Sequence, residues 1–214
     1  MVECLSPRTT AIARKSLSWL RARVSLSFLA TLEYPLIFQP ELILHQPTGL
    51  IYLACSTPSS RVHWTPAVSR LNATGASRDD YVAIYDPKSS AVTRLEVAGF
   101  SSTRGLSLHG MDVVPSSTNP SDLFIYLVNH RAPLGDALAK DVGADSVIEI
   151  FKTTVRGKTL TYLKTIESPV IITPNDIVGS PDGDSFYFTN DHGEKVGFVS
   201  RKPISSGWAL INRV

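Results

Sequence analysis

Short apolar runs recur along residues 34–214, and most are bounded by Pro, Gly, Asn, Asp or Ser. Such runs predict β-strands separated by turns. Three strongly apolar runs align with one another, and each is followed by a second, similar run: LIYLAC, FIYLVN and FYFTND, followed by VAIYD, IEIFK and VGFVS. These imperfect repeats, at a spacing of roughly 60–70 residues, predict repeated antiparallel meanders.

The repeats define the expected strands, and longer polar stretches at residues 56–80 and 130–145 are expected to be loops. The predicted strands are Leu50–Cys55, Tyr81–Tyr85, Ala91–Val97, His109–Val114, Leu123–Asn129, Ser146–Lys152, Leu160–Ile166, Asn175–Val178, Ser185–Thr189, Lys195–Ser200 and Trp208–Ile211. The three strongest apolar runs are expected to be the inner strands of three sheets.

Repeated meanders favour an all-β fold, a partial β-propeller of about three blades that would be half of a larger ring or an open fragment. A β-sandwich with coincidental internal similarity is the alternative. Because a closed propeller has at least about four blades, the chain is expected to be truncated relative to the full ring. Its open sheet edges then predict self-association.

Composition separates a basic N-terminal segment, residues 1–33, from the propeller domain, residues 34–214. The chain has 214 residues, 43% hydrophobic and 19% charged, with a net charge of +2. The first segment is rich in Arg and Ser and is expected to be partly helical or disordered. The near-neutral remainder argues against a nucleic-acid partner.

The cellular compartment stays open on sequence grounds. The apolar piece 24–32 is too short and too polar to span a bilayer, and the basic N-terminus is compatible with mitochondrial targeting. The sequon Asn72-Ala73-Thr74 supports secretion and glycosylation of Asn72 only weakly. Membrane association is a further possibility. Two cysteines, Cys4 and Cys55, define no disulfide framework or metal spacing.

Polar residues gather at the ends of the predicted strands. His109 begins one strand and His130 follows another, while residues 175–176 and 190–191 are Asn-Asp pairs on either side of the turn Ser180–Gly183. In a propeller, strand ends from successive blades converge on one face. Amide and carboxylate oxygens suit calcium, although Asn and Asp are also common turn residues and a lone histidine is often structural.

Four segments resemble the paraoxonase/arylesterase family, whose members are calcium-dependent six-bladed propellers that hydrolyse lactones and aryl esters. They are Leu108-His109-Gly110, Leu127–His130, Ser146–Lys152 with Leu163–Ile166, and Pro174–Val178 through Phe188–His192. They occur in the family's order and at similar spacing, and the resemblance runs from about residue 34 to 199.

The resemblance implies catalytic roles for three histidines. His109 and His130 resemble the family's histidine pair, the first acting as general base toward water, and His192 resembles a histidine close to the same channel. Two calcium sites are also implied. Asn175 resembles a ligand of the catalytic calcium, and Asp176, with the main-chain carbonyl of Met111, resembles the structural site.

One departure concerns the family's adjacent Glu-Asp pair, where this chain has only Glu41, in Gln39-Pro40-Glu41-Leu42. The family's remaining calcium ligands come from later blades. Two functions therefore stay open: a calcium-dependent hydrolase of small aryl esters or lactones, and a non-catalytic half-propeller or binding module. A gluconolactonase-type or strictosidine-synthase-type propeller matches the histidine motifs less well.

Overall fold

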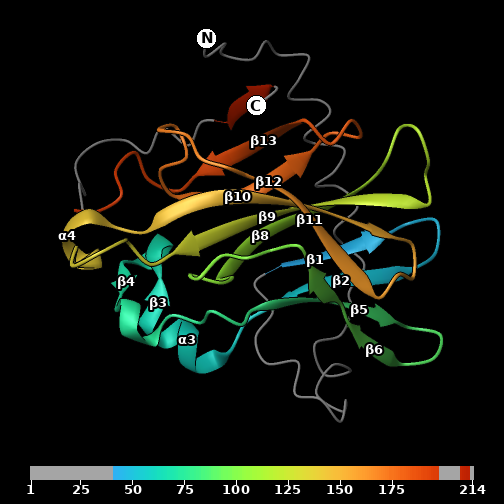
Figure 1. Cartoon of the computed structure of the whole chain (residues 1–214), viewed down its shortest axis with the longest axis horizontal. Helices are drawn as coiled ribbons and strands as arrows, with labels where there is room; N and C mark the ends of the chain where they lie inside the picture. The colour runs from blue at the N-terminus through green and yellow to red at the C-terminus, as the bar shows by residue number, and fades with distance from the viewer. Residues whose placement is uncertain (1–40, 198–207, 213–214) are drawn as a thin grey trace. The chain divides into compact units, whose positions relative to one another are not determined.

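Antiparallel sheets dominate the chain in a computed structural model that describes residues 41–197 and 208–212 (Figure 1). All of these residues belong to one of the chain's two units. The predicted basic segment, residues 1–33, lies outside the described residues.

Three larger sheets follow one another along the sequence, each built around an antiparallel meander. The first contains, in spatial order, β1 (Glu41–His45), β2 (Leu50–Cys55), β5 (Tyr81–Asp86) and β6 (Ala91–Arg94). The second contains β7 (Glu96–Ala98), β11 (Thr159–Ile166), β10 (Asp145–Thr154), β9 (Asp122–Arg131) and β8 (Leu108–Pro115). The third contains β12 (Pro174–Gly179), β13 (Ser185–Asn190) and β14 (Trp208–Asn212).

The second sheet lies between the other two, and its strands β9 and β10 are buried on both faces. Along β9, Ile125 and Leu127 pack into a core shared with the first sheet. The intervening Tyr126 and Val128 pack into a core shared with the third sheet. This alternation follows from the two-residue period of a strand and explains why the run LFIYLVN is almost continuously apolar.

The predicted all-β, partial-propeller fold of antiparallel meanders is confirmed. The prediction of the inner strands was wrong. β8 contacts both β1 and β12, so the inner strand of each meander is its first strand and not, as predicted from the sequence, its second. The three apolar runs form β2, β9 and β13, the second strands. A second strand has neighbours on both sides and is the most buried, whereas the inner strands carry His109, Asn175 and Asp176; His130 lies near the end of the second strand β9.

Two further strand predictions need correction. The run Ala91–Val97 divides at the buried Leu95 into β6 and β7, and β7 joins the second sheet in parallel with β11. Residues 195–197 of the predicted strand Lys195–Ser200 are not extended, and 198–200 lie outside the described residues. Gly197 has φ of +88°, which interrupts an extended run. The neighbour of β13 is β14 instead.

The polar stretch 56–80, predicted to be a loop, folds into short elements that we call the cap segment, residues 57–76. They are α3 (Pro58–His63), β3 (Trp64–Thr65), a 3₁₀ turn (Pro66–Val68), β4 (Arg70–Leu71) and a second 3₁₀ turn (Ala73–Gly75). Thr57 caps α3 because its hydroxyl accepts a hydrogen bond from the Ser60 N–H at 3.3 Å.

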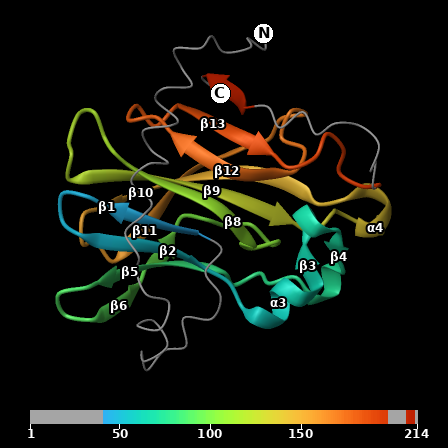
Figure 2. The same ribbon diagram turned by 180° about the vertical axis from the view of Figure 1, so that it is seen from behind.

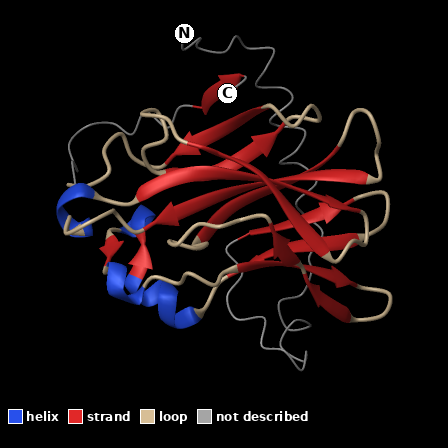
Figure 3. Ribbon diagram, viewed as in Figure 1, coloured by secondary structure: helices blue, strands red, loops and turns tan. Residues whose placement is uncertain are grey.

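The cap segment packs beside α4 (Ala139–Val142), which lies in the other predicted loop (Figures 2 and 3). The fully buried indole of Trp64 joins Ala139 and Ala144 in a small apolar cluster. Across residues 41–197 and 208–212, helices are too short and too polar to cross a bilayer.

Candidate functional site

Two β-bulges shape the site where β8 and β12 meet. The pairing of β8 with β9 shifts register between Leu108 and Met111, at the residues His109-Gly110. The pairing of β12 with β13 shifts between Pro174 and Ile177, at Asn175-Asp176. A bulge redirects side chains away from the regular alternation and is common beside active sites. Both predicted motifs therefore lie on locally irregular strands.

Gly110 allows these two inner strands to approach closely. A Cβ atom at this position would lie 2.0 Å from the carbonyl oxygen of Asn175, a separation that no side chain tolerates. The absence of a side chain at Gly110 thus lets the β8 backbone contact the β12 backbone. This contact brings His109 next to Asn175.

The structure brings His109, His130 and Asn175 together, as the sequence predicts. The two imidazole rings have centroids 5.3 Å apart. His109 Nε2 lies 3.1 Å from Asn175 Oδ1, and the Asn175 side-chain amide donates to Asp191 Oδ1 at 2.6 Å. The second Asn-Asp pair therefore contributes Asp191, which holds the amide of the first pair.

His130 is buried, with 1% of its surface exposed. Its Nδ1 lies 2.9 Å from the hydroxyl oxygen of Ser146 on β10, and its carbonyl accepts the indole N–H of Trp64 at 2.8 Å. Its Nε2 is buried without a hydrogen-bond partner in the described part of the chain.

Arg61 of α3 reaches the same histidines and was not predicted. One guanidinium nitrogen lies 3.4 Å from His109 Nδ1, and the other donates to the carbonyl of Leu108. The buried Asp80 accepts the Leu108 N–H at 2.8 Å and faces the Arg61 charge. Arg61 precedes His109 by 48 residues within a polar stretch, so no periodic signal identifies it.

The electrostatic surroundings favour neutral histidines. Burial lowers the pKa of His109 and the Arg61 charge lowers it further, while Asn175 and Asp191 partly oppose the change. Burial, then His109 and Arg61, hold the pKa of His130 well below its usual value. A neutral imidazole is the form that accepts a proton.

His192 lies against the cap segment. Its Nε2 is 2.9 Å from the carbonyl oxygen of Ala67, and its backbone N–H donates to Thr173 Oγ1 at 2.8 Å. The cap segment thus contacts all three predicted histidines, through Arg61, Trp64 and Ala67. Asn72 is an exposed residue of the same segment, and its Oδ1 accepts a hydrogen bond from Thr74 at 2.7 Å.

Carboxylates gather near the predicted structural calcium site. Burial raises the pKa of Glu41 to about 7, and the Asp176 and Asp112 charges add to this effect against the Leu42 N–H. Asp112 also has a raised pKa, about 6, mainly through burial. Met111, on the same strand, is fully buried opposite Leu127. Asp112 was not predicted, and only its position next to Met111 could have suggested it.

These carboxylates influence one another but do not form a ready-made cage. Within residues 41–197 and 208–212, no three His, Cys, Asp or Glu side chains converge as a metal-binding group. Their donor atoms are all oxygens, the type that calcium prefers. The charges of Asp176 and Asp112 contribute to the raised pKa of Glu41. A bound cation would relieve this repulsion between carboxylates.

Comparison with known proteins identifies the family. The model of the family described as Arylesterase matches residues 70–200. The chain belongs to the arylesterase family. The matched range contains every predicted site residue except Glu41, and it begins after Arg61 and Trp64. The resemblance inferred from the histidine and Asn-Asp motifs is therefore confirmed.

A curated relative of this arylesterase-family chain is serum paraoxonase/lactonase 3 of Mus musculus. The two are 31% identical over 98 residues, which cover 46% of this chain and 24% of the relative. The match thus spans about a quarter of the relative's length.

Proposed function

We propose that the chain is a calcium-dependent hydrolase of small aryl esters or lactones. The main supporting observation is the His109–His130 pair, placed by the two bulges beside Asn175. Family membership supports the ester-hydrolase class, and the relative's name, paraoxonase/lactonase, supports the choice of substrates.

In this proposal His109 removes a proton from the attacking water. Its lowered pKa keeps it neutral near pH 7, which a general base requires. Asn175 Oδ1 can only accept a hydrogen bond, so the 3.1 Å contact is a donation from His109 Nε2–H and the basic lone pair is on Nδ1. Nδ1 faces the Arg61 guanidinium at 3.4 Å, and a water bound on this side of the ring would give its proton to Nδ1. Asp191 accepts from the Asn175 amide and holds the orientation of that side chain.

The residues present fit calcium by the chemistry of their donor atoms. Asn175 would supply a side-chain oxygen to the catalytic ion, while Glu41, Asp176 and the Met111 carbonyl would supply the structural site. Calcium usually takes about six to eight oxygen ligands, so each site would need further oxygens beyond these. Bound calcium would polarise the ester carbonyl and stabilise negative charge on its oxygen.

The test is turnover of phenyl acetate and a δ-lactone by the purified full chain. We expect hydrolysis that requires calcium, stops with EDTA and returns when calcium is restored. His109→Gln should reduce kcat by about 100-fold or more, the usual contribution of a general base. His63→Gln is the matched control, because His63 is exposed and contacts Asn72.

Equal loss in both histidine variants, or turnover that EDTA leaves unchanged, would contradict the mechanism. A second candidate is a non-catalytic binding module with the propeller fold. It is favoured by the lack of a convergent metal-binding group within the described residues. It predicts no turnover and no calcium binding by calorimetry, so stoichiometric calcium binding would argue against it.

A further inference from the structure

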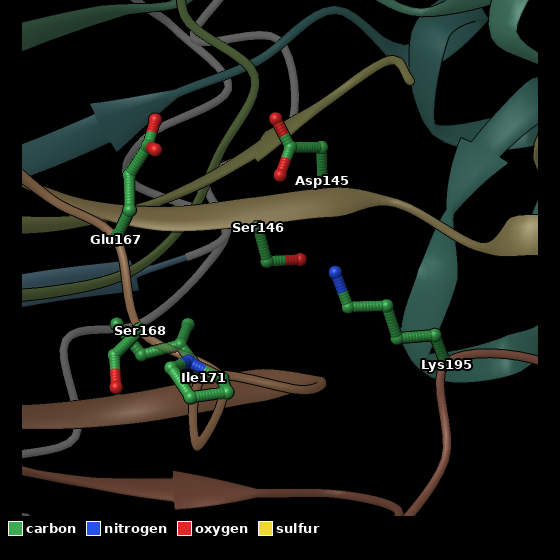
Figure 4. A pocket seen from close by; sticks show the side chains of 7 residues that line it. Asp145, Ser146, Glu167, Ser168, Ile171 and Lys195 are labelled. Carbon is green, nitrogen blue, oxygen red and sulfur yellow. The ribbon is translucent and has the colours of Figure 1, made fainter. Parts of the chain in front are cut away.

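A pocket lies next to His130 at the start of β10 (Figure 4). Its volume is about 300 Å³, and its lining includes Asp145, Ser146, Glu167, Ser168 and Lys195. Figure 4 shows the Lys195 side chain extending toward Ser146. Ser146 is thus shared between this pocket and the histidine pair, since its hydroxyl is hydrogen-bonded to His130 Nδ1 at 2.9 Å.

Arginines hold the pocket's acidic groups. Arg131 bridges Asp145 and Glu167 at 2.6 and 2.8 Å, and Arg104 also pairs with Asp145. These ion pairs hold the two carboxylates beside the pocket, whereas the Ser146 hydroxyl is engaged with His130. A serine hydroxyl can accept one hydrogen bond and donate another at the same time. It can therefore accept from His130 and donate toward the pocket.

The surroundings of His130 favour one of its two neutral forms. If Nε2 carried the proton, that N–H would be a buried donor with no acceptor within the described residues. Buried N–H groups without partners are rarer than buried acceptors without partners. Arg61 and His109 are the groups whose charges act on His130, and a positive charge nearby favours a lone pair over an N–H.

We propose that Ser146 is a positioning residue that holds His130 protonated on Nδ1 and leaves the lone pair on the buried Nε2, in a ring whose centroid lies 5.3 Å from that of His109. The Nδ1–H bond is donated to Ser146 Oγ, and the serine proton points into the pocket. His130 then carries its acceptor on Nε2, the nitrogen that is buried without a hydrogen-bond partner in the described residues. This role deepens the proposed hydrolase function, in which His109 is the base.

The decisive measurement is the ring-nitrogen ¹⁵N NMR spectrum of histidine-labelled full chain, with His130→Gln used to assign the signals. In the wild type we expect His130 Nδ1 to resonate as a protonated nitrogen and Nε2 as an unprotonated one. Ser146→Ala should shift both signals toward a mixture of the two forms. Ser146→Thr keeps the hydroxyl and should restore the wild-type pattern.

Ser168→Ala is the matched control, because Ser168 lines the same pocket and its hydroxyl accepts the Val170 N–H instead. Its spectrum at His130 should be unchanged. A wild-type His130 protonated on Nε2 would overturn the proposal without any variant. A Ser146→Ala spectrum identical to wild type would overturn it as well, and thermal unfolding verifies that the variant is folded.

Kinetics provide a second readout that depends on the proposed function. Ser146→Ala should lower kcat for phenyl acetate by about 10-fold, a typical effect for a group that orients a functional residue. KM should change little, Ser146→Thr should recover most of kcat, and Ser168→Ala should match the wild type. If the wild type has no turnover, the hydrolase proposal fails, while the NMR result still decides the role of Ser146.

Discussion

Replacing Gly110 with alanine tests the idea that the site depends on direct contact between two strand backbones. The added Cβ would be 2.0 Å from the Asn175 carbonyl oxygen. Real Cβ contacts essentially never fall below 3.0 Å, so β8 and β12 would have to separate by about 1 Å. The opposing atom belongs to the backbone, and no flexible side chain can move away to relieve the clash.

Overpacking of this kind costs about 1–3 kcal/mol of folding free energy. For a chain of this length, each kcal/mol lowers the Tm by roughly 2–4 °C, so the expected decrease is roughly 2–12 °C. The strand separation should also lengthen the 3.1 Å contact between His109 Nε2 and Asn175 Oδ1. Turnover should therefore fall together with stability.

Urea unfolding followed by far-ultraviolet circular dichroism measures the change. Gly193→Ala is the matched control, because a Cβ at Gly193 would meet no atom within 4 Å. We expect the control to remain within about 0.5 kcal/mol of wild type. Equal unfolding midpoints for the two variants would show that β8 and β12 are not in backbone contact, and the described arrangement of the site would be wrong.

Three further predictions concern the cap segment, acid stability and calcium. Trp64→Phe removes the indole N–H that donates to the buried His130 carbonyl. The substitution should lower the free energy of unfolding in urea by about 1–3 kcal/mol. No measurable decrease would refute the contribution of this hydrogen bond. Burial raises the pKa of Asp145, but Arg104 and Arg131 outweigh it and lower the pKa below 3.8. The stabilisation of the fold by the ionised Asp145 is therefore fully present above pH 3.8 and is lost as pH falls through the folded-state pKa. The difference in unfolding free energy between wild type and Asp145→Asn should shrink on acidification. A difference that grows would contradict this assignment. Added calcium should raise the Tm, with about 2.7 kcal/mol of stabilisation when free calcium is 100 times Kd. Asp176→Asn should weaken this stabilisation. Asp184→Asn is the control and should leave it unchanged, because the exposed Asp184 side chain pairs with Lys164.

Features tied to strand ends could be predicted from the sequence. Apolar alternation identified most of the strands, and the residues His109, His130 and Asn175 were placed together because their strand ends converge. The bulges could not be predicted, because a register shift depends on the partner strand. Strand β1 was missed because Glu41–His45 is short and its apolar residues 42–44 are consecutive in sequence, so the exposure of Leu42 and Leu44 is not visible as an alternating pattern.

The cap segment was predicted to be a loop for a related reason. Its elements are two to six residues long, too short to show either helical or strand periodicity. They are held mainly by tertiary contacts such as the burial of Trp64 against Ala139 and Ala144. Contacts of this kind join distant parts of the chain, as Arg61 and His109 do, and leave no local pattern in the sequence.

The parallel pairing of β7 with β11 has a consequence for synthesis on the ribosome. β7 follows the first meander in sequence, yet its hydrogen-bonding partner β11 is about sixty residues further along the chain. While the polypeptide emerges, β7 must wait for that partner, because non-local pairings cannot form until both strands are present. Residues 96–98 should therefore become protease-resistant only once residue 166 has left the exit tunnel, although the first meander before them is already complete in sequence.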